Sequence, residues 1–127
     1  MKAKPAAAAA PTREELEQRV RELTAALERA HQEIRNLSTT DELTGLLNRR
    51  GFYALAQKML QKAKREGAQC VLAFIDVDGL KRVNDQFGHE AGDAMIADVA
   101  GVLKRTLRES DVVARLGGNE FCVLAAD

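Results

Sequence analysis

Two carboxylates stand together after an apolar run in the second half of the chain. The run covers residues 70–75, and Asp76-Val77-Asp78 follows it. Successive side chains of a strand point to opposite faces, so Asp76 and Asp78 are expected to share one face. Two carboxylates at the end of a buried strand need a neutralising partner, and a divalent metal is one candidate. The alternative is that one carboxylate caps the next helix while the other accepts hydrogen bonds from backbone amides.

A glycine-rich turn is the second feature of the sequence that bears on chemistry. Gly117-Gly118-Asn119 separates two strand-like runs, residues 112–116 and 120–125. Glycines between two such runs are typical of a tight hairpin, because glycine adopts the backbone angles that the turn requires. The sequence therefore predicts an antiparallel pair of strands with a sharply turned tip.

The elements that position these groups follow from apolar spacing. The run at 70–75 is short, bounded by Gly67 and Gly79 and rich in strand formers, which predicts a central strand buried on both faces. A short helix is expected over 80–86, followed by a glycine-bracketed loop over 87–93. Two amphipathic helices are expected to have apolar faces formed by Phe52, Leu55, Ala56, Met59 and Ala63, and by Met95, Val99, Val102, Leu103 and Leu107.

The first third of the chain has a different texture. Residues 1–11 read as a disordered Ala/Pro tail, and Thr12 with Glu15 forms the pattern of a capping box at a helix start. An apolar repeat with alternating spacings of four and three then predicts a coiled-coil dimerisation helix over 12–38. Packing of this helix back onto its own domain is the alternative. The repeat consists of Leu16, Val20, Leu23, Leu27, Ala30, Ile34 and Leu37.

Composition excludes several classes of protein. The 127 residues carry 19 Lys+Arg and 19 Asp+Glu, for a formal net charge of +0, which argues against nucleic acid or an anionic membrane as a partner. No apolar run approaches the ~18 residues of a membrane-spanning helix. Cys70 and Cys122 are isolated in apolar runs, so they are interpreted as buried, reduced thiols. A reducing compartment, the cytoplasm, follows from that interpretation.

Four motifs in order resemble the GGDEF family, the diguanylate cyclases. Residues 41–50 (DELTGLLNRR) are similar to the family's opening element, and residues 74–85 to its metal-binding strand and the following helix. Residues 87–93 (FGHEAGD) resemble a family loop, and residues 115–121 (RLGGNEF) resemble the signature hairpin. The resemblance runs from Asp41 to the last residue. A short coiled coil before the domain is also typical of the family.

The resemblance implies a fold and a reaction. The fold is α+β, a ferredoxin-like palm shared with nucleotidyl cyclases and polymerases, over residues 39–127. The reaction joins two GTP molecules into cyclic di-GMP with release of two pyrophosphates. Because each domain holds one GTP, the reaction needs a homodimer, and the coiled coil would raise the effective concentration of the second domain. The implied cofactor is Mg²⁺ (or Mn²⁺).

The resemblance also implies roles for single residues. Asp76, the Val77 carbonyl, Asn119 and Glu120 are the implied metal and catalytic positions. For substrate, Asn84 and Asp93 would bind the guanine edge, Lys81 would contact a phosphate, and Gly117 and Gly118 would let the backbone approach the triphosphate. Arg108 and Asp111 match an RxxD site that binds cyclic di-GMP as an inhibiting product. The alternative for Arg108 is a favourable interaction with the helix dipole.

The chain departs from the family pattern in two ways. The signature reads GGNEF, with Asn119 where active members carry Asp or Glu, so metal binding is expected to weaken. One interpretation is a non-catalytic module that binds GTP or cyclic di-GMP; the other is residual activity through Asp76 and Glu120. Second, the sequence stops at Asp127, just after the hairpin, so only the first half of the palm is expected. A dimerising fragment with no ligand is the third hypothesis.

Overall fold

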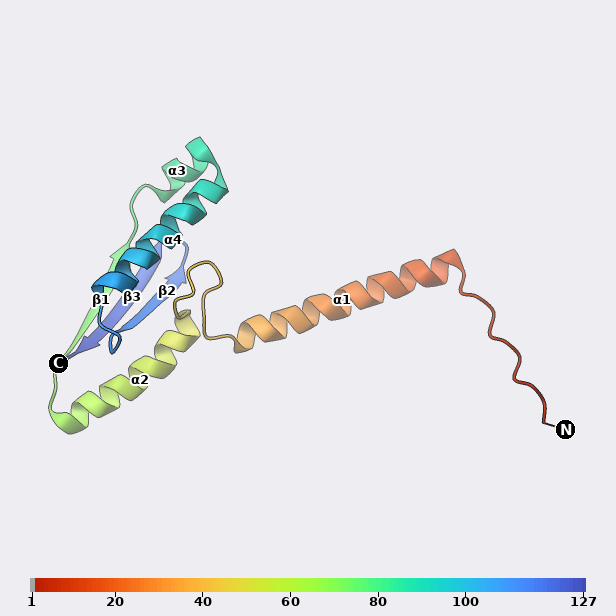
Figure 1. The fold of residues 1–127 in the computed structure, drawn as a ribbon, viewed down its shortest axis with the longest axis horizontal. Helices are drawn as coiled ribbons and strands as arrows, with labels where there is room; N and C mark the ends of the chain where they lie inside the picture. The colour runs from red at the N-terminus through yellow and green to blue at the C-terminus, as the bar shows by residue number, and fades with distance from the viewer. Residues whose placement is uncertain (1) are drawn as a thin grey trace. The chain divides into compact units, whose positions relative to one another are not determined.

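The computed structural model describes residues 2–127, which divide into two units at Leu37 and Ser38. The first unit contains helix α1 (Arg13–Leu37) (Figure 1). The predicted capping box is present: Thr12 Oγ1 accepts from the Glu15 amide at 3.2 Å, and a Glu15 carboxylate oxygen accepts from the Thr12 amide at 2.8 Å. No residue of α1 is buried, and its apolar stripe is exposed; Leu23, for example, is 61% exposed.

The second unit, Ser38–Asp127, is built on a three-stranded antiparallel sheet. Its strands are β1 (Cys70–Asp76), β2 (Val112–Gly117) and β3 (Glu120–Ala126), in the order β1-β3-β2 (Figure 1). The predicted hairpin is confirmed, since β2 and β3 are consecutive antiparallel neighbours joined at Gly118-Asn119. β3 lies in the centre, and β1 and β2 are the two edges.

Helices cover both faces of this sheet. Helix α2 (Arg49–Glu66) packs on one face, where Phe52 and Ala56 meet Cys122 and Leu124 of β3. Helix α4 (His89–Thr106) packs on the other, where Ile96 meets Phe121. Helix α3 (Leu80–Phe87) packs against α4 (Figure 1). Alternate residues of β3 therefore serve two cores, as the period of a strand requires. The α+β class predicted from the sequence is confirmed.

Local signals account for α2. Asn48 caps its first turn by accepting from the Gly51 amide at 2.9 Å, and Gly67 ends it in the left-handed conformation with φ of 69°. The predicted apolar face is confirmed at Phe52, Ala56 and Ala63, which are buried, and at Met59, which is partly buried against the same core. It is wrong at Leu55, which is 42% exposed.

The prediction of a central strand buried on both faces is wrong for residues 70–76. β1 pairs only with β3, and Phe74 is 72% exposed and Val71 67% exposed. The run of strand formers predicted the strand correctly, but α2 and α4 pack over β2 and β3 and leave most of β1 uncovered. An exposed apolar edge strand is a hazard for strand-to-strand association.

The predicted glycine-bracketed loop over 87–93 is largely helical. α3 ends at Phe87 and α4 begins at His89, so only Gly88 separates them. The φ of Gly88 is 90°, and one residue in this conformation is enough to redirect the chain. The buried face of α4 also differs from the prediction: Ile96 and Ala100 are 1% exposed, whereas Val102 is 51% exposed.

The two cysteines are free thiols with different environments. Cys122 of β3 is fully buried, and burial raises the pKa of its thiol, opposed by a hydrogen bond with the backbone of Val123. Cys70 is only half-buried, so the prediction of two buried thiols is confirmed for Cys122 alone.

No helix within residues 2–127 has the length and apolar character needed to cross a bilayer.

Candidate functional site at the hairpin tip

The end of β1 and the start of β3 bring two carboxylates side by side. In the antiparallel register Asp76 is the direct partner of Glu120, so their side chains lie on the same face of the sheet. The pairing continues past the strands, because the Val77 amide donates to the Asn119 carbonyl at 2.9 Å. The Asn119 side-chain amide donates in turn to the Val77 carbonyl at 3.0 Å. The four residues implied as metal and catalytic positions therefore form one contiguous corner.

The two carboxylates border an open hollow. Asp76 and Glu120 are exposed, while Val77 is 9% exposed and anchors the corner in the core beneath α4. The hollow has a volume of about 420 Å³ and is also lined by Arg49, the first residue of α2. Arg49 belongs to the opening motif, but the motif by itself indicated no role for this residue. Arg49 is the cationic residue among those that line this hollow.

The donor atoms at this corner fit a hard divalent cation. They are carboxylate oxygens of Asp76 and Glu120, the Val77 carbonyl and the Asn119 amide oxygen, and Mg²⁺ is bound through oxygens of these kinds. Within residues 2–127 there is no cluster of three or more His, Cys, Asp or Glu side chains that would hold a metal by themselves. A cation here would therefore depend on Val77 and Asn119 as well as on the two carboxylates.

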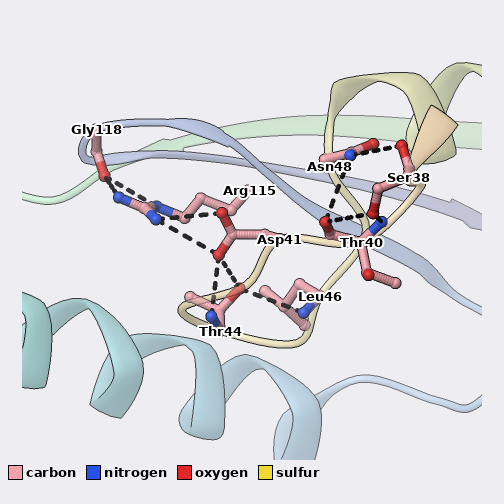
Figure 2. A network of polar contacts seen from close by, with 8 residues as sticks. All are labelled: Ser38, Thr40, Asp41, Thr44, Leu46, Asn48, Arg115 and Gly118. Carbon is pink, nitrogen blue, oxygen red and sulfur yellow. Dashed lines mark hydrogen bonds and ion pairs between the residues drawn. The ribbon is translucent and has the colours of Figure 1, made fainter. Parts of the chain in front are cut away.

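A polar network fixes the hairpin tip to the chain segment that precedes α2. Figure 2 shows Arg115 between Gly118 and Asp41, with its guanidinium donating to the Gly118 carbonyl at 2.9 and 3.1 Å and to Asp41 at 3.2 Å. Asp41 also accepts from the amide and hydroxyl of Thr44, at 2.9 and 2.7 Å. The side chains of Arg115 and Asp41 are only 15% and 20% exposed.

The sequence analysis placed Asp41 and Arg115 in separate motifs and did not predict this contact. The sequence signal for this contact is the opposite charge of Asp41 and Arg115. In the structure, each is the one charged residue of its motif that is half-buried. A half-buried carboxylate next to an arginine fork forms a charge-assisted hydrogen bond of well-defined geometry. The network therefore sets the conformation of the loop over 41–46 and of the tip together.

The implied guanine-binding residues lie on α3 and α4. Asn84 of α3 is half-buried, and its Oδ1 is buried without a hydrogen-bond partner. That oxygen lies directly over Gly92 of α4, because a Cβ built on Gly92 would come within 1.7 Å of it. Asp93 is the next residue and is exposed, as is Lys81 in the first turn of α3. Asn84 and Asp93 are thus carried by two helices in direct contact.

The two glycines of the signature adopt the backbone angles that the turn requires. Gly117 has φ of 142° and Gly118 has φ of 48°, values that L side chains rarely adopt. Nothing lies within 4 Å of a Cβ built on either residue, so the space over the tip is open. The glycines are required by the turn itself, and they leave the backbone accessible to a ligand.

Arg108 and Asp111 lie at the other end of the domain. They follow the C-terminus of α4, whereas Asp93 lies near its start, which separates them by roughly 20 Å of helix. Asp111 accepts from the Arg108 amide at 2.8 Å; its side chain is 5% exposed, and its Oδ1 has no hydrogen-bond partner. Both residues line a groove of about 790 Å³ with several cationic neighbours, Lys58, Lys62 and Lys104.

Comparison with known proteins gives consistent matches. Diguanylate cyclase DgcP of Pseudomonas aeruginosa is 43% identical over 90 residues, which cover 71% of this chain and 13% of that protein. The cyclic di-GMP phosphodiesterase NbdA of the same organism is 41% identical over 107 residues, covering 84% of this chain and 14% of that protein. Probable diguanylate cyclase DgcJ of Escherichia coli is 37% identical over 99 residues, which cover 78% of this chain and 20% of that protein. The chain thus spans a fifth or less of these relatives.

Solved structures of GGDEF domains also resemble this chain. The GGDEF domain of DgcB from Caulobacter crescentus, in complex with c-di-GMP, matches with a TM-score of 0.67 and 37% identity over 70% of this chain and 52% of that one. The coiled coil and GGDEF domain of the same protein, also with c-di-GMP, match with a TM-score of 0.65 and 35% identity over 87% and 60%. The family described as diguanylate cyclase, GGDEF domain, matches residues 38–127. The corner formed by β1 and the β2–β3 tip is therefore that of a GGDEF domain, and this chain belongs to the GGDEF family.

Proposed function

We propose that residues 39–127 act as a diguanylate cyclase-type domain, which joins two GTP molecules into cyclic di-GMP and releases two pyrophosphates. The observation that carries this proposal is the register of β1 and β3, which pairs Asp76 with Glu120 beside an open glycine tip. The reaction builds negative charge on a phosphorus centre, and a site with carboxylates for a cation and open backbone for phosphates suits that chemistry. The cytoplasm, where GTP is formed, is the proposed location.

Each side chain has a proposed task. Asp76, the Val77 carbonyl, Glu120 and the Asn119 amide oxygen would hold Mg²⁺ or Mn²⁺, which supplies Lewis-acid chemistry at the reacting phosphate when bound. Other residues would hold the substrate at points distant from the metal. Asn84 and Asp93 would bind the guanine edge, Lys81 would contact a phosphate, and the backbone of Gly117 and Gly118 would approach the triphosphate.

The guanine assignment has a specific chemical basis. Guanine presents a paired N1–H and N2–H₂ edge, and an acidic side chain such as Asp93 accepts from both donors. Adenine lacks that pair, so a site built around Asp93 would reject ATP. Asn84 and Asp93 lie on two helices in direct contact, which suits joint contact with one base.

The homodimer is proposed to form through α1. Its exposed apolar stripe repeats every three to four residues, which suits a partner helix of the same sequence. Two domains joined in this way would present two GTP molecules to each other. Arg108 and Asp111 are proposed to bind cyclic di-GMP as a regulatory product. The support is that Arg108 and three lysines (Lys58, Lys62 and Lys104) line the groove and suit phosphates, beside four acidic residues that line it too: Glu66, Glu109, Asp111 and Asp127.

A second candidate function is a binding module that takes GTP or cyclic di-GMP without turnover. One observation favours it: the Asn119 side chain donates to the Val77 carbonyl, so the corner is hydrogen-bonded without a cation. The loss of a formal charge at position 119 also weakens the attraction for Mg²⁺.

One set of measurements separates these functions. The 127-residue chain is incubated with GTP and MgCl₂, and cyclic di-GMP is measured by chromatography. A cyclase is expected to give product that Asp76→Asn abolishes and Asn119→Asp increases. Calorimetric binding of GTP or cyclic di-GMP without any product in either the parent or Asn119→Asp would favour the binding module. If neither nucleotide binds, both proposals fail.

A further inference from the structure

The corner between β1 and the hairpin tip is closed by two hydrogen bonds that join the same two residues. The Val77 amide donates to the Asn119 carbonyl at 2.9 Å, and the Asn119 side-chain Nδ2 donates to the Val77 carbonyl at 3.0 Å. Val77 is buried and Asn119 is half-buried, so water competes poorly for these groups. The second bond is the one that depends on the type of side chain at position 119.

The chemistry of the two groups fixes how they face each other. A peptide carbonyl only accepts, whereas an asparagine amide has one donor end and one acceptor end. Only the NH₂ end can therefore lie 3.0 Å from the Val77 oxygen with a favourable interaction. A carboxylate at position 119 has no hydrogen to donate at neutral pH. Its oxygens would face the carbonyl oxygen repulsively unless a cation lay near both.

We propose that the Asn119 amide acts as a metal-independent latch. It holds the hairpin tip to the Val77 peptide by a hydrogen bond, where an acidic residue at this position would need a cation to do so. The candidate site is then preassembled without metal. A metal that bound the Val77 carbonyl and the Asn119 oxygen together would turn the amide so that its oxygen replaced Nδ2 beside that carbonyl, and this hydrogen bond would be lost. The inference deepens the proposed function, on which the identity of the site rests.

The latch has two measurable consequences of opposite sign. Without metal, loss of one partly buried hydrogen bond is expected to lower the folding equilibrium constant about two- to tenfold in Asn119→Ala. Asn119→Asp is expected to lose at least as much, because it adds repulsion from the Val77 carbonyl, Asp76 and Glu120. With metal, Asn119→Asp is expected to bind Mn²⁺ about tenfold more tightly than the parent, since it gains a charge and has no hydrogen bond to break.

The experiment uses the full 127-residue chain. Urea unfolding in EDTA is compared for the parent, Asn119→Ala and Asn119→Asp, and Mn²⁺ affinity is measured by electron paramagnetic resonance. Gln57→Glu, at an exposed position in the middle of α2, is the matched control for added charge and is expected to change neither value. In the parent, the Asn119 side-chain NH₂ signals in a nitrogen–proton spectrum in EDTA are expected to show slow solvent exchange, a measurement that needs no variant to fold.

The outcomes are distinct. Equal stability of the parent and Asn119→Ala in EDTA, or rapidly exchanging Asn119 NH₂ protons, would overturn the latch. Failure of Asn119→Asp to fold in EDTA, with recovery in Mn²⁺, would support it. The proposed function is tested separately by GTP titration of the parent. If GTP does not bind but the stability order holds, the latch stands and the nucleotide assignment fails; if GTP binds but the order does not hold, the reverse applies.

Discussion

Replacement of Gly92 by alanine tests whether a glycine at this position of α4 is needed to accommodate the Asn84 side chain. A Cβ at this position would lie 1.7 Å from Asn84 Oδ1, half of the 3.4 Å at which ordinary contact begins, and 2.8 Å from its Cγ. Leu80 Cδ1 would also be close, at 3.2 Å. The amide of Asn84 must therefore move out of its position over α4. Gly101, in the same helix, provides the control, because a Cβ there would meet only the end of the flexible Arg105 side chain at 3.2 Å.

The magnitude follows from two opposing effects. Alanine is favoured over glycine inside a helix by about 0.8–1 kcal/mol, and both variants gain this. Overpacking typically costs about 1–3 kcal/mol, and only Gly92→Ala incurs it. The two variants should therefore differ in free energy of unfolding by about 1–3 kcal/mol, with Gly101→Ala the more stable. For a domain of this size that is roughly 4–8 °C in Tm for each kcal/mol.

The assay is urea and thermal unfolding of both variants, followed by calorimetric titration with GTP. If Asn84 binds the guanine edge, its displacement should weaken GTP binding about tenfold in Gly92→Ala, the loss expected for one good hydrogen bond to a buried polar group. Gly101→Ala should retain the parent affinity. Equal stability and equal GTP affinity of the two variants would refute the argument that Gly92 is required by Asn84.

Three further predictions concern other parts of the molecule. Arg115→Ala removes the hydrogen bonds to the Gly118 carbonyl and leaves half-buried Asp41 without its cationic partner, with only Thr44 still donating to it. Urea unfolding should therefore show a loss of about 1–3 kcal/mol. Iodoacetamide should label Cys70 first and Cys122 only on unfolding, because Cys122 is buried and its raised pKa leaves less thiolate at neutral pH, as mass spectrometry would reveal. Leu23→Lys on α1 should abolish the proposed dimer, measured by analytical ultracentrifugation.

Each of these has a matched control. Arg13→Ala breaks an ion pair with Glu17 whose side chains are 90% and 49% exposed, and it should cost less than about 0.5 kcal/mol. An equal cost for Arg115→Ala would show that burial does not strengthen the Arg115 pair. Equal labelling rates of the two thiols in the folded chain would contradict the burial of Cys122. For α1, Gln18→Lys lies off the stripe, and it should leave the dimer intact; loss of the dimer there would point to charge rather than packing.

Local sequence signals predicted several elements in both units. The α2 face, the capping box at Thr12 and the β2–β3 hairpin depend on residues close together in the chain. The capping box and the hairpin are confirmed, and the α2 face is confirmed except at Leu55. The role of β1 as an edge was not predictable in this way. Apolar, strand-forming residues indicate a strand, but which neighbours pair with it and which helices cover it depend on contacts distant in the sequence.

The same distinction between local sequence signals and contacts distant in the sequence applies to the candidate site. The resemblance to the GGDEF motifs implied roles for Asp76 and Glu120, and the register of β1 with β3 pairs them directly. The contacts that hold the corner join residues far apart in the chain: Arg115 with Asp41, and Asn119 with Val77. Which end of an amide faces a carbonyl depends on that three-dimensional arrangement, so no linear pattern could have indicated it.

The central position of β3 couples the integrity of the site to that of the whole domain. Residues 120–124 pair with β1 on one side and with β2 on the other, so both of the strand's hydrogen-bonding edges are occupied. In native-state hydrogen exchange, backbone amides in such a strand open only with the global unfolding transition. Glu120 begins this strand, and the scaffold beneath it should therefore not melt by local fraying. Loss of the strand that carries Glu120 would therefore coincide with global unfolding at every denaturant concentration.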